Sequence, residues 1–414
     1  MTEILDKCKK AKAAAIKLGN ISTEIKNKAL DAMADALGEN SKNIIDANKK
    51  DLRAGEKKGL SLALLDRLML NEKRILGIID SLDVVKKLKD PVFEVISEWT
   101  RPNGLRIQKR RVPLGVIGII YEARPNVTVD SASLCMKSGN ATVLRGGSDA
   151  INSNKILAEI ISCAAYKVGI PDGSICLIED TSRKSSEELM GMRGYLDVLI
   201  PRGGKNLIQT VIQKAKVPTI ETGEGNCHAY VEKTADLKMA LEIVYNSKVS
   251  RPSVCNAIET LLVDEEIAAK FLPMIFSELK EANVEVRGDK KVLAIDSSIK
   301  KATDEDWTTE FLSLILAVKV VKDYKEAVDH INRYGTKHSE TIITKDKEAE
   351  NYFLSYVDAS SVYVNASTRF TDGGEFGFGS EIGISTQKLH ARGPMGLPEL
   401  TSYKYVVYGD GQIR

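Results

Sequence analysis

The beginning of the chain has the spacing of apolar residues that predicts helices. Ser22 is suited to capping a helix, and apolar residues on one helical face follow it: Ile25, Ala29, Met33, Ala36 and Leu37. Gly38 comes directly after that stripe and favours its end. The same spacing recurs over residues 62–82, so residues 1–90 are predicted to be largely helical.

The pattern then changes, and alternating segments predict a β-hairpin. Residues 95–99 and 105–108 flank a Pro-Asn-Gly sequence at 102–104, which is typical of a tight turn. The charged residues 109–111 indicate that part of this hairpin is exposed. Residues 402–408 are also β-rich. We expect the hairpin and this tail to extend the sheet of a partner subunit.

From residue 115 onward, short apolar runs alternate with helical stretches, a rhythm typical of a parallel α/β sheet. The apolar runs are 116–120, 141–144, 174–178 and 197–200, and the helical stretches include 154–168 and 204–215. A second series follows, with helices at 237–245 and 324–334 and strands at 257–263 and 315–321. Two α/β domains with a boundary near residue 222 are predicted.

Composition and charge exclude several classes of protein. The 414 residues are 43% hydrophobic, which argues against disorder, and a single core seldom exceeds about 250–300 residues, so two or more domains fit. The net charge of +2 gives no field that would favour nucleic acid or an anionic membrane as the main partner. The six cysteines lack C-x-x-C and zinc-ligand spacing, and no apolar window is long enough to span a membrane. A cytoplasmic protein without a bound metal is expected.

Two glycines between an apolar run and a helix form a candidate phosphate-binding turn. Gly203 and Gly204 follow the run at 197–200 and precede the helix that begins near residue 205. Free N–H groups at such a helix start can meet a phosphate. The segment lacks the first glycine of a Walker motif, and 373–379 lacks the spacing of a Rossmann fingerprint. A plain strand-to-helix turn explains Gly203 and Gly204 at least as well.

Cys255 is the cysteine whose surroundings favour chemistry. It lies in a polar segment just before an apolar strand, whereas Cys163 and Cys176 lie within apolar periodic segments. Glu221, in a Glu-Thr-Gly-Glu-Gly segment that we expect to end another strand, precedes Cys255 by 34 residues. Asn126, after the run at 116–120, offers a side-chain amide of the kind that an oxyanion hole requires. Each residue alone is also compatible with a turn or cap.

Together these three residues resemble the aldehyde dehydrogenase superfamily. Its chains carry, in this order, a loop Asn, a basic residue after a strand, a Gly turn, a Glu-x-Gly segment and a Cys about 34 residues later. The resemblance runs along nearly the whole chain. More narrowly, four segments are similar to the superfamily members that reduce glutamyl phosphate in proline biosynthesis: 121–128, 221–228, 327–340 and 364–370.

The resemblance implies an α/β fold of the aldehyde dehydrogenase type, with two parallel-sheet domains and a small β module for oligomerisation. Residues 1–222 would form the cofactor-binding domain, whose hairpin at about 95–112 belongs to the oligomerisation module. Residues 223–390 would form the catalytic domain, and 391–414 the oligomerisation tail. A homodimer or homotetramer is implied.

The resemblance also implies roles for individual residues. Cys255 would be the nucleophile, Asn126 the oxyanion donor beside the Cys255 N–H, and Glu221 the residue that activates water in hydrolytic relatives. Whether Glu221 keeps a role in a reductase stays open. The residues assigned to the cofactor NADP(H) are Arg145, Ser148, Gly203, Gly204 and Glu310. Ser148 stands where NAD-preferring relatives often carry a carboxylate, which favours NADP.

The implied reaction is the NADPH-dependent reduction of L-glutamyl 5-phosphate to L-glutamate 5-semialdehyde and phosphate, through a Cys255 thioester. Because this substrate carries a carboxylate and a phosphate, cations near the predicted site are candidates to bind it: Arg251, His338, Arg369 and Arg392. Surface charge explains each of these equally well. The alternatives are a hydrolytic NAD(P)-dependent aldehyde dehydrogenase, which Glu221 permits, and a cofactor-free binding protein that keeps the fold.

Overall fold

The computed structural model describes residues 2–414, which form two compact units. Unit 1 comprises residues 2–222, 377–383 and 395–414, and unit 2 comprises residues 223–376 and 384–394. The division falls between Thr222 and Gly223, next to the boundary expected from the sequence. Two later segments differ from the expected division at residue 390: residues 377–383 belong to unit 1, and residues 391–394 stay with unit 2 before the chain returns to unit 1 at Met395.

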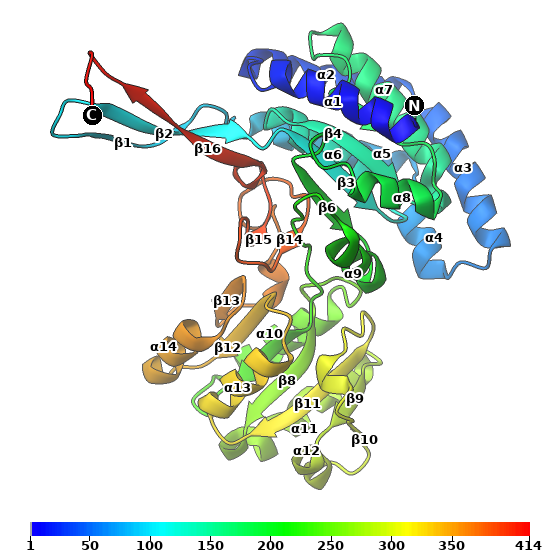
Figure 1. The fold of residues 1–414 in the computed structure, drawn as a ribbon. Coiled ribbons are helices and arrows are strands. Elements are labelled where there is room, and N and C mark those ends of the chain that lie inside the picture. The colour runs from blue at the N-terminus through cyan, green and yellow to red at the C-terminus, as the bar shows by residue number, and fades with distance from the viewer. Residues whose placement is uncertain (1) are drawn as a thin grey trace. The chain divides into compact units, whose positions relative to one another are not determined.

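Unit 1 contains a four-stranded parallel sheet of order β5-β4-β3-β6, covered by helices (Figure 1). Its strands are β3 (Val116–Tyr121), β4 (Ala141–Gly146), β5 (Ile175–Leu177) and β6 (Val198–Arg202). Its helices are α1 (Glu3–Leu18), α2 (Thr23–Glu39), α3 (Ser41–Lys57), α4 (Leu62–Leu68), α5 (Glu72–Lys87), α6 (Asn126–Lys137), α7 (Ile151–Lys167), α8 (Arg183–Met190) and α9 (Lys205–Lys214), with a 3₁₀ turn η1 (Ser148–Ala150) before α7.

A second, three-stranded antiparallel sheet of unit 1 joins distant parts of the chain. Strands β1 (Val95–Thr100) and β2 (Arg106–Pro113) form a hairpin, and β16 (Thr401–Tyr408) pairs with β2. Gly104, at φ 87°, allows the tight turn between β1 and β2. Figure 1 shows this sheet extending away from the helices of unit 1. The predicted hairpin and the β-rich character of the tail are therefore confirmed, and the structure adds that the tail pairs with the second strand of the hairpin.

Unit 2 contains a seven-stranded sheet of order β10-β9-β11-β8-β7-β12-β13, in which every pair is parallel. The strands are β7 (Cys227–Val231), β8 (Ile258–Asp264), β9 (Glu285–Gly288), β10 (Lys300–Lys301), β11 (Ile315–Val321), β12 (Ser339–Ile343) and β13 (Ser361–Val364). The helices are α10 (Leu237–Val249), α11 (Glu265–Glu281), α12 (Lys290–Ile295), α13 (Tyr324–Tyr334) and α14 (Lys347–Tyr356), with 3₁₀ turns η2 (Asp306–Thr308) and η3 (Thr368–Phe370). A short pair, β14 (Ile384–Ser385) and β15 (Gly393–Pro394), also belongs to this unit, while η4 (Pro398–Leu400) belongs to unit 1.

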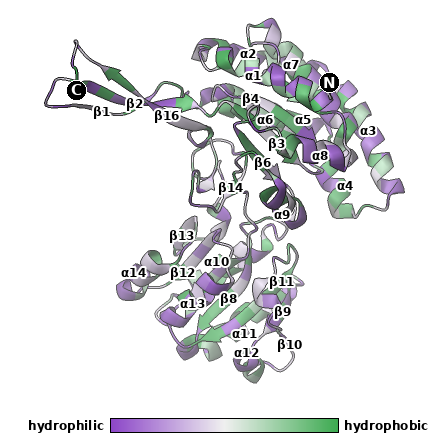
Figure 2. Ribbon diagram, in the orientation of Figure 1, coloured by the Kyte–Doolittle hydropathy of each residue, from purple (hydrophilic) through white to green (hydrophobic). Residues whose placement is uncertain are grey.

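Continuous apolar runs form the centre of both parallel sheets. Strands β3 and β4 are buried at every position, as is β8, because helices cover both faces of such sheets. Figure 2 shows this contrast: the strands are mainly hydrophobic, whereas the helices carry both hydrophobic and hydrophilic residues. The alternation of strands and helices predicted from residue 115 onward is confirmed.

Two local predictions differ from the structure. The helical pattern at 62–82 is divided into α4 and α5, because Asn71 caps a new helix by accepting a hydrogen bond from the N–H of Arg74. The segment before Glu221 forms only an isolated bridge between Thr219 and Leu199 instead of a regular strand. By contrast, Ser22 does cap α2, accepting from the N–H of Ile25.

Among residues 2–414, no helix combines the length and apolar character needed to cross a bilayer.

Candidate active site

The candidate nucleophile lies in a loop of unit 2 that joins α10 to β8. Cys255 is partly exposed there. Lys248, near the end of α10, and Glu259, on β8, form a fully buried ion pair that brackets this loop. Burial raises the pKa of Glu259 to about 7, although Lys248 opposes that shift. Removing one partner of such a pair typically costs about 3–5 kcal/mol, so the pair fixes both ends of the loop.

The backbone of Cys255 packs directly against Gly225, the residue two positions before β7. A Cβ atom at Gly225 would lie 1.5 Å from the Cys255 carbonyl oxygen and 2.5 Å from its Cα, so only glycine fits. The N–H of Gly225 donates to Oε1 of Glu310 at 2.7 Å. Glu310, assigned from the sequence to a cofactor ribose, therefore also anchors the segment that supports Cys255.

The far side of the loop is held by the segment around η3. The side-chain amide of Asn256 donates to the carbonyl oxygens of Arg369 and Thr371, at 3.2 and 2.9 Å, while Thr368 donates to the Asn256 carbonyl at 2.7 Å. Arg369 also donates through Nε to the Ser250 hydroxyl at 3.0 Å. These contacts link both ends of the loop to one turn of the chain.

Two predicted cations, Arg251 and Arg369, interact electrostatically with each other, and Arg369 also interacts with Cys255. Burial is the main cause that lowers the pKa of Arg369, the charge of Arg251 lowers it further, and the thiolate form of Cys255 raises it. Arg251 is exposed, whereas Arg369 is partly buried. Arg369 is thus tied through Ser250 to the loop that carries Arg251 and Cys255, and a cation in this position suits an anionic acyl substrate.

The other two predicted cations lie in different surroundings. His338 is fully buried, and burial lowers its pKa to about 4, so it is neutral at pH 7 and does not supply the cation that the sequence suggested. Its Nδ1 lies 2.8 Å from the Ser339 hydroxyl. Arg392 is partly exposed, and its Nη2 pairs with Asp358 at 2.7 Å. Lys388 pairs with the same carboxylate at 2.9 Å.

Sequence reasoning missed a buried polar cluster at the start of β7 and β12. The Glu340 carboxylate accepts hydrogen bonds from the N–H and Nδ1 of His228, at 2.6 and 3.0 Å, and both side chains are fully buried. The ring of His330 stands edge-on to that of His228, with centroids 5.6 Å apart. These residues lie in the segments 221–228 and 327–340, whose similarity to a family was noted, but no charge or spacing rule marks such a contact.

Asn126 lies in unit 1, at the first position of α6. Its side-chain amide donates to Asp130 Oδ2 at 2.8 Å, one turn further along the helix. Burial raises the pKa of Asp130 to about 6, while the hydrogen bonds from Asn126 and Ser81 lower it. Because an amide nitrogen has two hydrogens, Asp130 fixes the orientation of Asn126 and still leaves a donor.

The glycine turn between β6 and α9 holds an anionic group of the chain itself. The N–H of Gly204 donates to Oε2 of Glu122 at 2.9 Å. A Cβ atom at Gly203 would lie 2.6 Å from the same oxygen. The turn can therefore bind an anionic oxygen, as expected for a diphosphate, and the exposed Glu122 carboxylate occupies that position here.

The remaining residues assigned to the cofactor differ in their availability. Arg145 is 9% exposed, and its Nη2 donates to the carbonyls of Thr181 and Ser182, at 2.6 and 2.8 Å. Ser148 is exposed at the start of η1. Beside it, Asp149 forms an ion pair with Lys58 at 2.8 Å. Lys58 is thus an exposed cation near Ser148 that the sequence pattern did not reveal.

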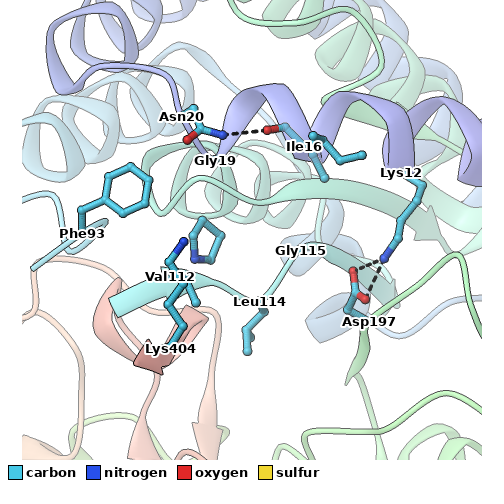
Figure 3. Close-up of a pocket in the computed structure, with 12 residues that line it drawn as sticks. Lys12, Ile16, Gly19, Asn20, Phe93, Val112, Leu114, Gly115, Asp197 and Lys404 are labelled. Carbon is cyan, nitrogen blue, oxygen red and sulfur yellow. Dashed lines mark hydrogen bonds and ion pairs between the residues drawn. The ribbon is translucent and has the colours of Figure 1, made fainter. Parts of the chain in front are cut away.

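Glu221 is partly exposed in the connection that follows the Thr219 bridge, at the end of unit 1. Other parts of unit 1 carry a pocket of about 300 Å³ between α1 and β2 (Figure 3). In that view Lys12 points toward Asp197, and the two form an ion pair at 2.8 Å. The residues assigned from the sequence do not line this pocket, so it is separate from the candidate site.

Within residues 2–414, groups of three or more His, Cys, Asp or Glu side chains that could hold a metal ion are not found.

Comparison with known proteins identifies the family of the chain. The family model described as "Aldehyde dehydrogenase family" matches residues 2–305. The chain belongs to this family. It is also 59% identical over 412 residues to gamma-glutamyl phosphate reductase of Halothermothrix orenii, which covers 100% of this chain and 99% of that protein. The enzyme of the same name from Bacillus mycoides is 58% identical over 414 residues, with both chains covered fully.

Solved structures agree with this assignment. The crystal structure of gamma-glutamyl phosphate reductase from Thermotoga maritima matches with a TM-score of 0.98 and 51% identity, covering 100% of both chains. An acetylating aldehyde dehydrogenase from Geobacillus thermoglucosidasius, at 20% identity, matches with a TM-score of 0.69, covers 100% of this chain and 97% of that one, and shows the shared fold alone. The predicted aldehyde dehydrogenase-like α/β fold is confirmed.

The neutral, buried state of His338 predicts a loss of stability in acid. Its pKa is lowered from 6.5 to about 4 in the folded protein. As the pH falls through 6.5, the unfolded chain binds this proton but the folded chain does not until about 4, so stability is lost across that window. His338→Gln should flatten the fall of the urea midpoint between these pH values. His390→Gln, at an exposed position, is the control; identical pH profiles for His338→Gln and the unmodified protein would contradict the assignment.

Proposed function

We propose that this protein reduces L-glutamyl 5-phosphate to L-glutamate 5-semialdehyde and phosphate, the second step of proline biosynthesis. The observation that carries the proposal is identity of 57–59% along the full chain to proteins named gamma-glutamyl phosphate reductase. The cation Arg369 supports it, because it donates to Ser250 in the loop that carries Arg251 and Cys255 and the substrate is an anionic acyl phosphate.

The proposed reaction begins at the thiol of Cys255. As thiolate it attacks the acyl carbon, the bond to the phosphate oxygen breaks, and the phosphate leaves with the electron pair to give a thioester. The loop contacts with Gly225 and Asn256 hold this nucleophile in place. We assign Asn126 and the N–H of Cys255 as donors to the tetrahedral oxyanion, each typically worth about 3–4 kcal/mol in acyl transfer.

Membership of the aldehyde dehydrogenase family implies a nicotinamide cofactor. When bound, the reduced nicotinamide would supply a hydride to the acyl carbon, and the C–S bond would then break to release the aldehyde and the thiolate of Cys255. The residues present fit such a group, because the N–H of Gly204 at the turn before α9 already binds an anionic oxygen, that of Glu122. We assign this turn to the diphosphate and Glu310 to a ribose.

We further propose that the cofactor is NADP(H) and that the protein is a cytoplasmic homodimer or homotetramer. Ser148 carries no charge that would repel a 2′-phosphate, and Lys58 pairs with the adjacent residue Asp149. For self-association, the sheet β1-β2-β16 exposes large apolar side chains that an isolated subunit would leave in water: Val95, Ile96, Trp99, Tyr403, Tyr405, Val407 and Tyr408.

The reaction run from the semialdehyde distinguishes this function from the hydrolytic alternative. Steady NADP reduction should rise from near zero as phosphate is added, and Cys255→Ala should lower the rate by about a thousandfold or more, because the covalent step has no other nucleophile. Cys163→Ala, at an exposed cysteine, is the control.

Glu221→Gln provides the complementary measurement. It should reduce the phosphate-dependent rate less than Cys255→Ala does, because a phosphate dianion needs little help from a general base. If Glu221 activates water instead, turnover would persist without phosphate, yield glutamate, and fall by about 10²–10⁴-fold in Glu221→Gln. That result would contradict the reductase proposal.

Lys58 is expected to favour the 2′-phosphate of NADPH over NADH. Lys58→Ala should lower the ratio of kcat/KM for NADPH to that for NADH by about tenfold, the size expected for a hydrogen bond between charged groups. Lys49→Ala is a matched control, since Lys49 lies on α3, the helix that ends just before Lys58, in an exposed ion pair with Asp46. If the ratio is unchanged, or if the unmodified enzyme prefers NADH, Lys58 and Ser148 do not determine the choice of NADPH.

Glu122 is expected to compete with the cofactor for the turn at Gly204. Its carboxylate must leave if a diphosphate accepts the same N–H, so Glu122→Ala should tighten NADPH binding by about three- to tenfold, in line with one anion at a helix start. NADPH fluorescence titration measures this directly. Glu187→Gln is the control, because Glu187 is an exposed carboxylate paired with Lys214 at the opposite end of α9; weaker binding in Glu122→Ala would show that Glu122 supports the turn.

A further inference from the structure

The thiol of a second cysteine lies beside the nucleophile of unit 2. Cys227, the first residue of β7, is fully buried, and its Sγ lies 3.1 Å from the carbonyl oxygen of Cys255. A carbonyl oxygen can only accept, so the thiol of Cys227 is the donor in this hydrogen bond. The proposed function uses Cys255 and leaves this second thiol without a role.

The position of Cys227 follows from the approach of Gly225 to Cys255. Gly225 touches the Cys255 peptide from one side, and Cys227, two residues later, contacts the oxygen of the same peptide. The backbone of Gly225 prevents the Cys255 peptide from moving closer to it, while the thiol of Cys227 holds the Cys255 carbonyl oxygen at hydrogen-bonding distance. The two contacts together restrict both the translation and the rotation of that peptide.

We propose that Cys227 is a positioning residue for the reaction of Cys255, holding the nucleophile's peptide through the S–H···O=C hydrogen bond. The inference deepens the proposed function and rests on Cys255 being its nucleophile. Cys227 does not touch the substrate, since it is sealed in the interior.

The surroundings of Cys227 keep its thiol protonated and in place. Burial raises its pKa well above the usual value, with the carboxylate of Glu340 adding to the shift. The ring of His338 lies on its other side, with Nδ1 3.7 Å from Sγ. The hydroxyl of Ser339 donates to Thr371, so its oxygen accepts from Nδ1 of His338 and fixes that ring. Cys227 is therefore a donor at neutral pH.

The test compares Cys227→Ser, Cys227→Ala and Cys227→Val in the phosphate-dependent oxidation of glutamate semialdehyde. Serine keeps a donor, alanine removes it, and valine removes it while filling the space. We expect kcat to fall about ten- to hundredfold in the alanine and valine variants, as for a small misplacement of reacting groups, with KM changed by less than about threefold. Serine should restore kcat to within about threefold of the unmodified enzyme, because its hydroxyl can donate to the same carbonyl.

Unit 1 offers a matched control. Cys176 is also buried, and its Sγ donates to a backbone carbonyl, that of Gly173, at 3.4 Å. Cys176→Ser and Cys176→Ala should therefore reproduce any general effect of losing a buried thiol while leaving kcat unchanged. Circular dichroism and the melting temperature of each variant establish that it is folded.

A second readout does not depend on turnover. The rate at which iodoacetamide alkylates Cys255, followed by mass spectrometry of its peptide from pH 6 to about 10, should change in Cys227→Ala and Cys227→Val and return in Cys227→Ser. If the valine variant keeps kcat and the alkylation profile, or if serine is as impaired as alanine, the proposal is wrong. If the unmodified protein shows no phosphate-dependent turnover, the proposed function fails instead, and alkylation still tests the contact.

Discussion

The close approach of Gly225 to Cys255 is the contact on which the candidate active site depends. Two peptides from the segments that enter neighbouring parallel strands, β7 and β8, meet without a side chain between them. Any Cβ at Gly225 would overlap the nucleophile's carbonyl group, so the loop could not keep its path. The hydrogen bond from Gly225 to Glu310 and the thiol of Cys227 then hold this contact from both sides.

Backbone contact of this kind places polar groups where water cannot reach them. Lys248, Glu259, His228 and Glu340 are all fully buried around the entry to these strands. Burial disfavours the charged forms of Lys248, Glu259 and Glu340, and each of the four residues has a specific partner in place of solvent. A loop supported by buried polar pairs resists small shifts, because moving it would break hydrogen bonds that water cannot replace. The nucleophile is therefore held in place, and the free-energy cost is the loss of hydration of the buried polar side chains.

The sequence predicted the elements well where a single element carries the signal. Apolar runs predicted β3, β4, β6 and β8, and Ser22 predicted the start of α2, because strand burial and helix capping depend on nearby residues. The environment of a side chain was predicted less well. From the sequence, His338 was a candidate cation for binding the substrate. The structure shows that it is buried, and burial makes it neutral.

The same limit applies to the site in unit 1. The glycine turn was visible in the sequence, but Glu122, which contacts it, is 82 residues away along the chain. Likewise Lys58 and Asp149 meet across 91 residues. Pairing of this kind follows from the order of strands and helices, which periodicity does not determine. The family resemblance could indicate the role of a motif residue, but it could not indicate which distant residue contacts it in the folded chain.

Two helix starts in unit 1 show how burial separates a structural anion from an exchangeable one. The carboxylate of Asp51, 2% exposed, accepts from the N–H groups of Asn152 and Ser153 at the start of α7. Glu122 does the same for Gly204 at the start of α9, but it is exposed. Both satisfy N–H groups that a helix start leaves unpaired. Displacing Asp51 would bury a donor without a partner, whereas Glu122 can turn into solvent when another anion takes its place, so only the second helix start suits a ligand that must bind and leave in each cycle.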